Sequence, residues 1–162
     1  MEKVVLSLAV TFVTAGLMAQ SGSAGRSEVG FKDVKTELTY NNYLQLKDAL
    51  VASNADAARE SAARLKTSLG SVSNSQNAMS EADKIATTAT IDVIRKTFAS
   101  LSTEMTAIVK AGKVSKGVLY LEYCPMANKN TGAYWLSNEK EIKNPYFGDK
   151  MLKCGSVKET IH

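Results

Sequence analysis

The order of hydrophobic and polar residues predicts four amphipathic helices between residues 36 and 112. The first, over residues 36–52, carries an apolar stripe at spacings of three, three and four: Tyr40, Tyr43, Leu46 and Leu50. Such spacing places the side chains on one face of a helix. Asn54 and Asp56 follow, and short polar side chains of this kind end one helix and cap the next. The pattern therefore predicts two helices joined by a very short loop.

The next residues repeat the same helical period. The second helix has the narrow stripe Ala58, Ala62, Leu65 and Leu69. A polar loop is expected over residues 70–77, and a third helix runs from about Met79 to Ala86. The fourth helix has the most regular stripe, and it should end near Gly112: Ile91, Ile94, Phe98, Leu101, Met105 and Ile108. Short loops between successive amphipathic helices are typical of antiparallel neighbours.

The pattern changes after Gly117 to short alternating runs rich in β-forming residues. Strands are expected over residues 118–123, 133–137 and 156–161, with a turn over 128–132. The fold class predicted is mainly α: an up-and-down antiparallel four-helix bundle, with a small β-rich C-terminal cap packed on one end of it.

The N-terminus resembles a secretory signal. Lys3 precedes an uncharged apolar run that ends in small residues, so residues 1–19 are expected to be removed, with cleavage as late as residue 24. The run is short for a membrane span, and no stable membrane insertion is expected after cleavage. Residues 20–35 are interpreted as a linker or N-terminal arm, and 36–162 as one domain. The expected location is the periplasm or the extracellular medium.

Composition excludes several function classes. The net charge is +4, with 20 basic and 16 acidic residues spread along the chain, and nucleic-acid binding would need a concentrated basic patch. The single histidine is the last residue, His162, so a general base of the usual kind is missing. Glu139 and Glu141 are better explained by a solvated turn than by a catalytic carboxylate pair. No enzymatic activity is predicted.

Unusual chemistry is concentrated between residues 124 and 154. This stretch holds both cysteines, both prolines and the single tryptophan, and its sulfur atoms form two close pairs: Cys124 with Met126, and Met151 with Cys154. Thiolate and thioether sulfurs select soft ions such as Cu(I). One hypothesis is therefore a four-sulfur metal site, shielded from water by Tyr134 or Trp135.

The alternative is a disulfide between Cys124 and Cys154. Two cysteines in an exported protein usually pair, and closing a loop of this length contributes on the order of 3 kcal/mol. Mixed Cys/Met pairs are a weaker metal pattern than paired Cys-x-x-Cys or histidine motifs, so residue chemistry alone slightly favours the disulfide. Both interpretations stay open at this point.

Long stretches of the chain resemble a bacterial family of unknown function. They include Tyr123-Cys-Pro-Met-Ala127, Gly132-Ala-Tyr-Trp-Leu-Ser137 and Ile142-Lys-Asn-Pro-Tyr-Phe-Gly-Asp-Lys-Met-Leu-Lys-Cys-Gly155, together with Tyr43–Val51 and Ile94–Ser102 of the helical half. The resemblance covers about residues 38–161. The family occurs as small exported proteins and as a C-terminal domain on periplasmic adaptor subunits of heavy-metal efflux systems.

What the resemblance implies is an association with metal efflux. It moves the preference from the disulfide to Cu(I) binding at Cys124, Met126, Met151 and Cys154. It also implies an efflux adaptor or another envelope protein as partner. Association of this kind says little about mechanism, which has to come from the site itself.

Overall fold

The computed structural model describes residues 27–162. The predicted signal peptide and the start of the predicted arm lie outside these residues. Residues 27–35, expected to be linker, instead contain a strand and the first residues of a helix. β1 (Gly30–Phe31) pairs antiparallel with β2 (Val114–Lys116), and the helix follows at Val34. A two-residue strand is too short to show a hydrophobic period, so pattern analysis misses it.

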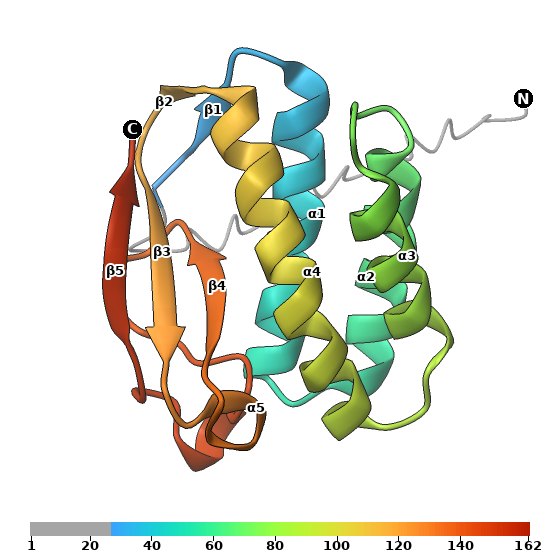
Figure 1. The fold of residues 1–162 in the computed structure, drawn as a ribbon, viewed down its shortest axis with the longest axis vertical. Coiled ribbons are helices and arrows are strands. Elements are labelled where there is room, and N and C mark those ends of the chain that lie inside the picture. The colour runs from blue at the N-terminus through green and yellow to red at the C-terminus, as the bar shows by residue number, and fades with distance from the viewer. Residues whose placement is uncertain (1–26) are drawn as a thin grey trace, which may run out of the picture.

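Four long helices make the protein mainly α, as predicted. They are α1 (Val34–Val51), α2 (Ala55–Leu69), α3 (Gln76–Thr87) and α4 (Ile91–Gly112). The predicted capping residue Asn54 accepts a hydrogen bond from the backbone N–H of Ala57 at 3.0 Å. Asp33 caps α1 in the same way through Lys35. Consecutive helices run in alternating directions, and α4 returns to pack against α1 (Figure 1).

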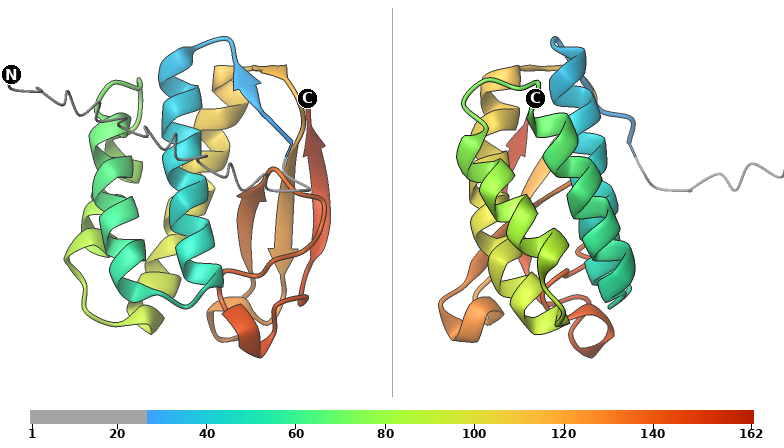
Figure 2. Two further views of the ribbon diagram at one scale, coloured as in Figure 1. Left: turned by 180° about the vertical axis from the view of Figure 1, so that it is seen from behind. Right: turned by 90° about the vertical axis from the view of Figure 1, so that its right-hand side faces the viewer.

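The C-terminal strands form one antiparallel sheet in the order β4-β3-β5. Its strands are β3 (Leu119–Cys124), β4 (Ala133–Ser137) and β5 (Ser156–Ile161). The sequence suggested that the sheet packs on one end of the helices, and the structure corrects this expectation. The sheet runs alongside them, with β4 nearest to α4, so that the sheet, the α1–α4 pair and the α2–α3 pair lie in succession (Figures 1 and 2).

Two short helical segments lie below the sheet in Figure 1: α5 (Ala127–Asn130) and the 3-10 turn η1 (Gly148–Lys150). Within the predicted turn at 128–132, three successive residues have a left-handed backbone: Asn128, Lys129 and Asn130. The turn closes on Gly132, where a Cβ atom would lie 2.0 Å from the hydroxyl of Tyr123. Glycine is therefore required at this point.

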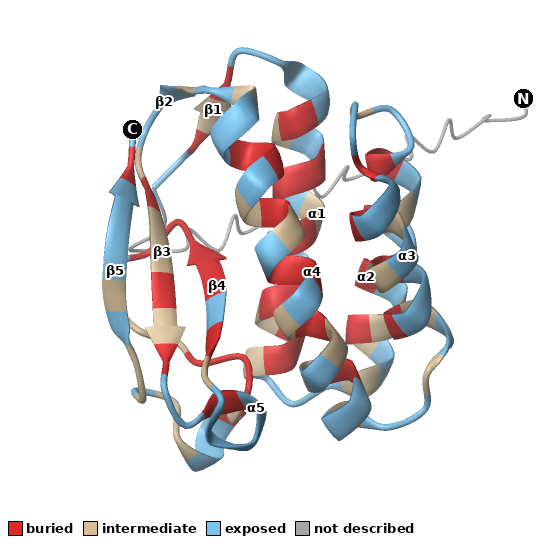
Figure 3. Cartoon of the chain, in the orientation of Figure 1, coloured by how far each residue is buried: buried red, intermediate tan, exposed pale blue. Residues whose placement is uncertain are grey.

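A chain of aromatic rings joins the α1–α4 pair to the sheet. Tyr43 of α1 stacks on Phe98 of α4, with ring centroids 5.3 Å apart, and Phe98 contacts Tyr146 at 5.8 Å. Tyr146 meets the edge of Trp135 in β4 at 5.9 Å. All four rings are buried, and the core runs through the interior from the helices into β4 (Figure 3). This core fixes the sheet against the α1–α4 pair.

Candidate functional site

The fold brings the two cysteines together. Cys124 ends β3 and Cys154 precedes β5, and the antiparallel register that pairs Tyr123 with Ser156 places them side by side. Their Sγ atoms are 2.8 Å apart. A disulfide bond is about 2.05 Å long, and two sulfurs on one tetrahedral ion with bonds of about 2.3 Å lie roughly 3.8 Å apart. The observed separation lies between these two values, so a small movement reaches either state.

No disulfide joins Cys124 and Cys154 in the structure, and the two cysteines differ in exposure. Cys124 is completely buried, whereas Cys154 is half-buried near the surface. The hydrogen bond with Cys124 is the main cause, and burial a smaller one, of the rise in the pKa of the Cys154 thiol to about 11. Cys154 therefore holds its proton at neutral pH, and metal binding or oxidation at the pair must remove it.

Asn144 positions Cys154, a role that the residue pattern did not predict. Its side-chain amide donates to the carbonyl of Cys154 at 2.7 Å, and its Oδ1 accepts from the backbone N–H of Tyr146 at 2.8 Å. Its own backbone N–H donates to Leu152. Asn144 is fully buried, and these hydrogen bonds satisfy its side-chain amide away from solvent. The Asn-Pro-Tyr-Phe-Gly segment is thus the support of the cysteine loop.

The two methionines have different surroundings. Met126 is 46% exposed and lines a surface pocket with Tyr146 and Phe147. Met151 is half-buried and directly follows η1. Residues 27–162 contain no group of three or more His, Cys, Asp or Glu side chains that could hold a metal ion. A metal at this place would depend on the two thiolates, with thioether sulfur for any further ligand.

The two aromatic residues predicted to shield the site point to opposite faces of β4, because successive strand residues alternate. Trp135 is fully buried, and a Cβ atom built on Gly155 would lie 2.8 Å from its ring, so the indole packs against the residue that follows Cys154. Tyr134 is 42% exposed and packs on Tyr123 of β3 at 4.5 Å between ring centroids. Of the two, Trp135 is the one beside the cysteine loop.

A second buried polar group lies on the Cys124 face of β3. Glu122 is fully buried, and neither carboxyl oxygen has a hydrogen-bond partner among residues 27–162. Burial raises the pKa of Glu122 to about 8, against the smaller opposing influence of Lys47. The indole N–H of Trp135 lies near enough to act in the same direction as Lys47, although the two groups do not reach hydrogen-bond geometry.

Sequence reasoning missed Glu122 and Lys47, yet both have a signal. Glu122 stands two residues before Cys124, so an inward-facing cysteine on this strand implies an inward-facing glutamate. Lys47 falls on the stripe of α1, four residues after Tyr43 and three before Leu50, and it is 1% exposed. It pairs with Asp48 at 3.1 Å.

The expectation of a solvated turn at Glu139 is wrong. Glu139 is buried and forms an ion pair with Lys143, and its backbone N–H donates to Ser137. Glu141 is exposed. The loop after β4 folds back against the protein, which a local composition of charged residues does not reveal.

A match to a known protein family covers the helical part of the chain. No curated protein and no solved structure gave a match. No helix within the described part of the chain combines the length and the apolar character that crossing a membrane requires. Residues 39–117, from the first turns of α1 to the residue after β2, match the family described as "Protein of unknown function (DUF3347)". The cysteine-containing sheet lies beyond the matched residues, and the helical half is therefore similar to a domain family whose function is unknown.

Proposed function

We propose that this protein is exported and binds a soft, Cu(I)-like ion through Cys124 and Cys154, as part of metal handling or efflux in the cell envelope. The observation that carries the proposal is the 2.8 Å distance between two sulfurs that are 30 residues apart in the chain. Two thiolates in contact are a donor set that selects soft ions over Mg²⁺ or Ca²⁺. The proposed site is in the periplasm or outside the cell, without enzymatic activity.

The residues present would act as follows. Cys124 and Cys154 would hold the ion as thiolates, and both would lose their protons when it binds. Met126 and Met151 are the proposed sources of further sulfur ligands. Because the pKa of Cys154 is raised to about 11, binding releases a proton at neutral pH, and affinity increases as the pH rises. The proposed partner is an efflux adaptor or another envelope protein that delivers or accepts the ion.

The second candidate is a structural or interaction module closed by a Cys124–Cys154 disulfide. The complete burial of Cys124 favours it, because a wholly buried sulfur is remote from an exchanging ion. Formation would transfer two electrons and two protons from the thiols to an oxidised dithiol, which is reduced in the exchange. The closed loop would stabilise the fold by about 3 kcal/mol.

Reduced protein is expected to take up one Cu(I) per chain under anaerobic conditions, in competition with a chromophoric Cu(I) chelator. Cys124→Ser and Cys154→Ser should each abolish uptake, because one thiolate cannot hold the ion alone. Met126→Leu and Met151→Leu remove one thioether each, and we expect affinity to fall about tenfold, or 1.4 kcal/mol, where that sulfur is a ligand. Met79→Leu, in α3, is the matched control and should leave affinity unchanged.

Intact mass before and after mild reductant separates the two candidates. A protein isolated with free thiols that binds Cu(I) supports the metal site. Absence of uptake by fully reduced protein contradicts it. A mass lower by two hydrogens that mild reductant does not restore, with no Cu(I) uptake, supports the disulfide-closed module instead.

A further inference from the structure

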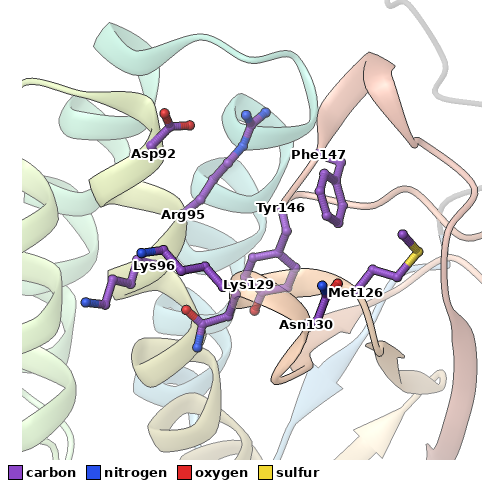
Figure 4. Close-up of a pocket in the computed structure, with 9 residues that line it drawn as sticks. Asp92, Arg95, Lys96, Met126, Lys129, Asn130, Tyr146 and Phe147 are labelled. Carbon is purple, nitrogen blue, oxygen red and sulfur yellow. The ribbon is translucent and has the colours of Figure 1, made fainter.

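A surface pocket with a volume of about 510 Å³ lies between the start of α4, the α5 turn and the loop before η1. Its nearly buried floor is the ring of Tyr146, with Phe147 and Met126 on one side and Arg95 and Lys96 on the other (Figure 4). The volume is in the range of pockets that hold ligands or partner side chains. Neither cysteine lines the pocket, although Met126 both lines it and is a proposed sulfur ligand beside the cysteine pair.

The pocket is built before any ligand arrives, because Arg95 fixes its wall. Arg95 Nε donates to the carbonyl of Pro145 at 3.0 Å, and its Nη2 donates to the carbonyl of Leu50 at 3.2 Å and to Ser53 Oγ at 2.9 Å. These bonds tie the loop that carries Tyr146 to the end of α1. Gly148 permits the close approach, since a Cβ atom there would lie 2.4 Å from Ser53 Oγ.

The charge around the pocket is unbalanced. Arg95, Lys96 and Lys129 line it against the single acid Asp92. Lys96 and Lys129 are exposed, and neither forms an ion pair with any residue in 27–162. Cations beside an apolar floor complement a ligand that combines carboxylates with a large apolar group.

Lys129 stands in a backbone conformation that costs free energy. Its φ and ψ are 59° and 45°, between two asparagines that are also left-handed. Asparagine adopts this conformation readily, whereas lysine does not. A third asparagine would suit the turn better, and the lysine found there adds a positive charge to the pocket lining.

We propose that this pocket binds an acidic peptide segment of a partner protein, with a large apolar side chain on Tyr146 and carboxylates paired with Lys96 and Lys129. A peptide fits better than a free small molecule, because the pocket is open to solvent along the exposed Met126, Lys96 and Asn128–Asn130. The inference does not depend on metal binding, and it is tested with metal-free protein.

The probe is an acetylated, amidated pentapeptide with one phenylalanine between two pairs of acidic residues. Titration into isotopically labelled protein should shift the amide resonances of residues 126–130 and 146–147, with saturation below about 1 mM. Lys129→Asn is expected to weaken binding about tenfold while the midpoint of thermal unfolding stays the same or rises. Lys35→Asn removes one exposed charge at the opposite end of α1 and should change neither quantity.

Three results would overturn the assignment. They are the absence of saturable shifts at the pocket, equal binding of a peptide with alanine in place of phenylalanine, and unchanged binding by the Lys129→Asn variant. A fourth, binding of free N-acetylphenylalanine as tight as that of the pentapeptide, would show a small-molecule site instead of a peptide site.

Discussion

Glu122→Gln is expected to stabilise the protein by about 5 kcal/mol at pH 9 and to leave its stability nearly unchanged at pH 4.5. In the folded protein burial raises the pKa of Glu122 to about 8, and in the unfolded chain it returns to about 4.5. Between these values the folded state binds the proton and the unfolded state does not. The free energy of unfolding therefore falls as pH rises from about 4.5 to 8, and it levels off above.

Glutamine keeps the shape of the protonated carboxyl and cannot ionise, so the stability of the variant does not fall as the pH rises. Urea unfolding at pH values from 4.5 to 9 measures the free energy of unfolding of both proteins, and the difference between the two values should widen steadily from pH 4.5 to 8. Glu141→Gln, at an exposed glutamate, is the control and should stay within about 0.5 kcal/mol of the original protein at every pH. Parallel curves for Glu122→Gln and the original would contradict a protonated Glu122.

Phe98→Ala should lower the free energy of unfolding by about 3–5 kcal/mol, the usual cost of emptying a buried phenylalanine site. Phe98 is fully buried between Tyr43 and Tyr146, so its ring connects α1, α4 and the loop that supports Cys154. Tyr43 in turn accepts a hydrogen bond from the backbone N–H of Leu136 in β4. A cavity at Phe98 therefore loosens the contact between helices and sheet.

The single tryptophan, Trp135, reports unfolding of the sheet side by fluorescence. Phe98→Leu keeps most of the volume and should cost less than about 1.5 kcal/mol. Val93→Ala lies on the same helix at a position that is 48% exposed, and it should be nearly neutral. A loss for Phe98→Ala as small as that for Val93→Ala would show that the aromatic chain does not hold the layers together.

The long helices could be predicted from sequence because their signal is local. The stripe of α4 repeats through six apolar residues, and the element runs from Ile91 to Gly112, as expected. Asn54 marks the start of α2 by its capping chemistry alone. The three strands of the C-terminal sheet also lie within a residue of their predicted bounds, because alternation over five or six residues is a local pattern as well.

The position of the sheet was not predictable in the same way. Nothing local to β3, β4 and β5 says whether they cover an end or a side of the helices. Contacts between distant residues decide it, among them the rings of Phe98 and Tyr146 and the hydrogen bond from Leu136 to Tyr43. The burial of Glu139 is of the same kind, since it depends on what another part of the chain places over it.

The helical class, the strands and the concentration of sulfur, proline and tryptophan between residues 124 and 154 could all be predicted from the order of residues. These follow from residue type and short-range spacing, which act whatever the rest of the chain does. Long-range packing brings Cys124 and Cys154 together, places Met126 at a surface pocket, and buries Glu122 with no hydrogen-bond partner among residues 27–162. Each of these depends on strand register and layer packing, which are set by contacts between residues far apart in the chain.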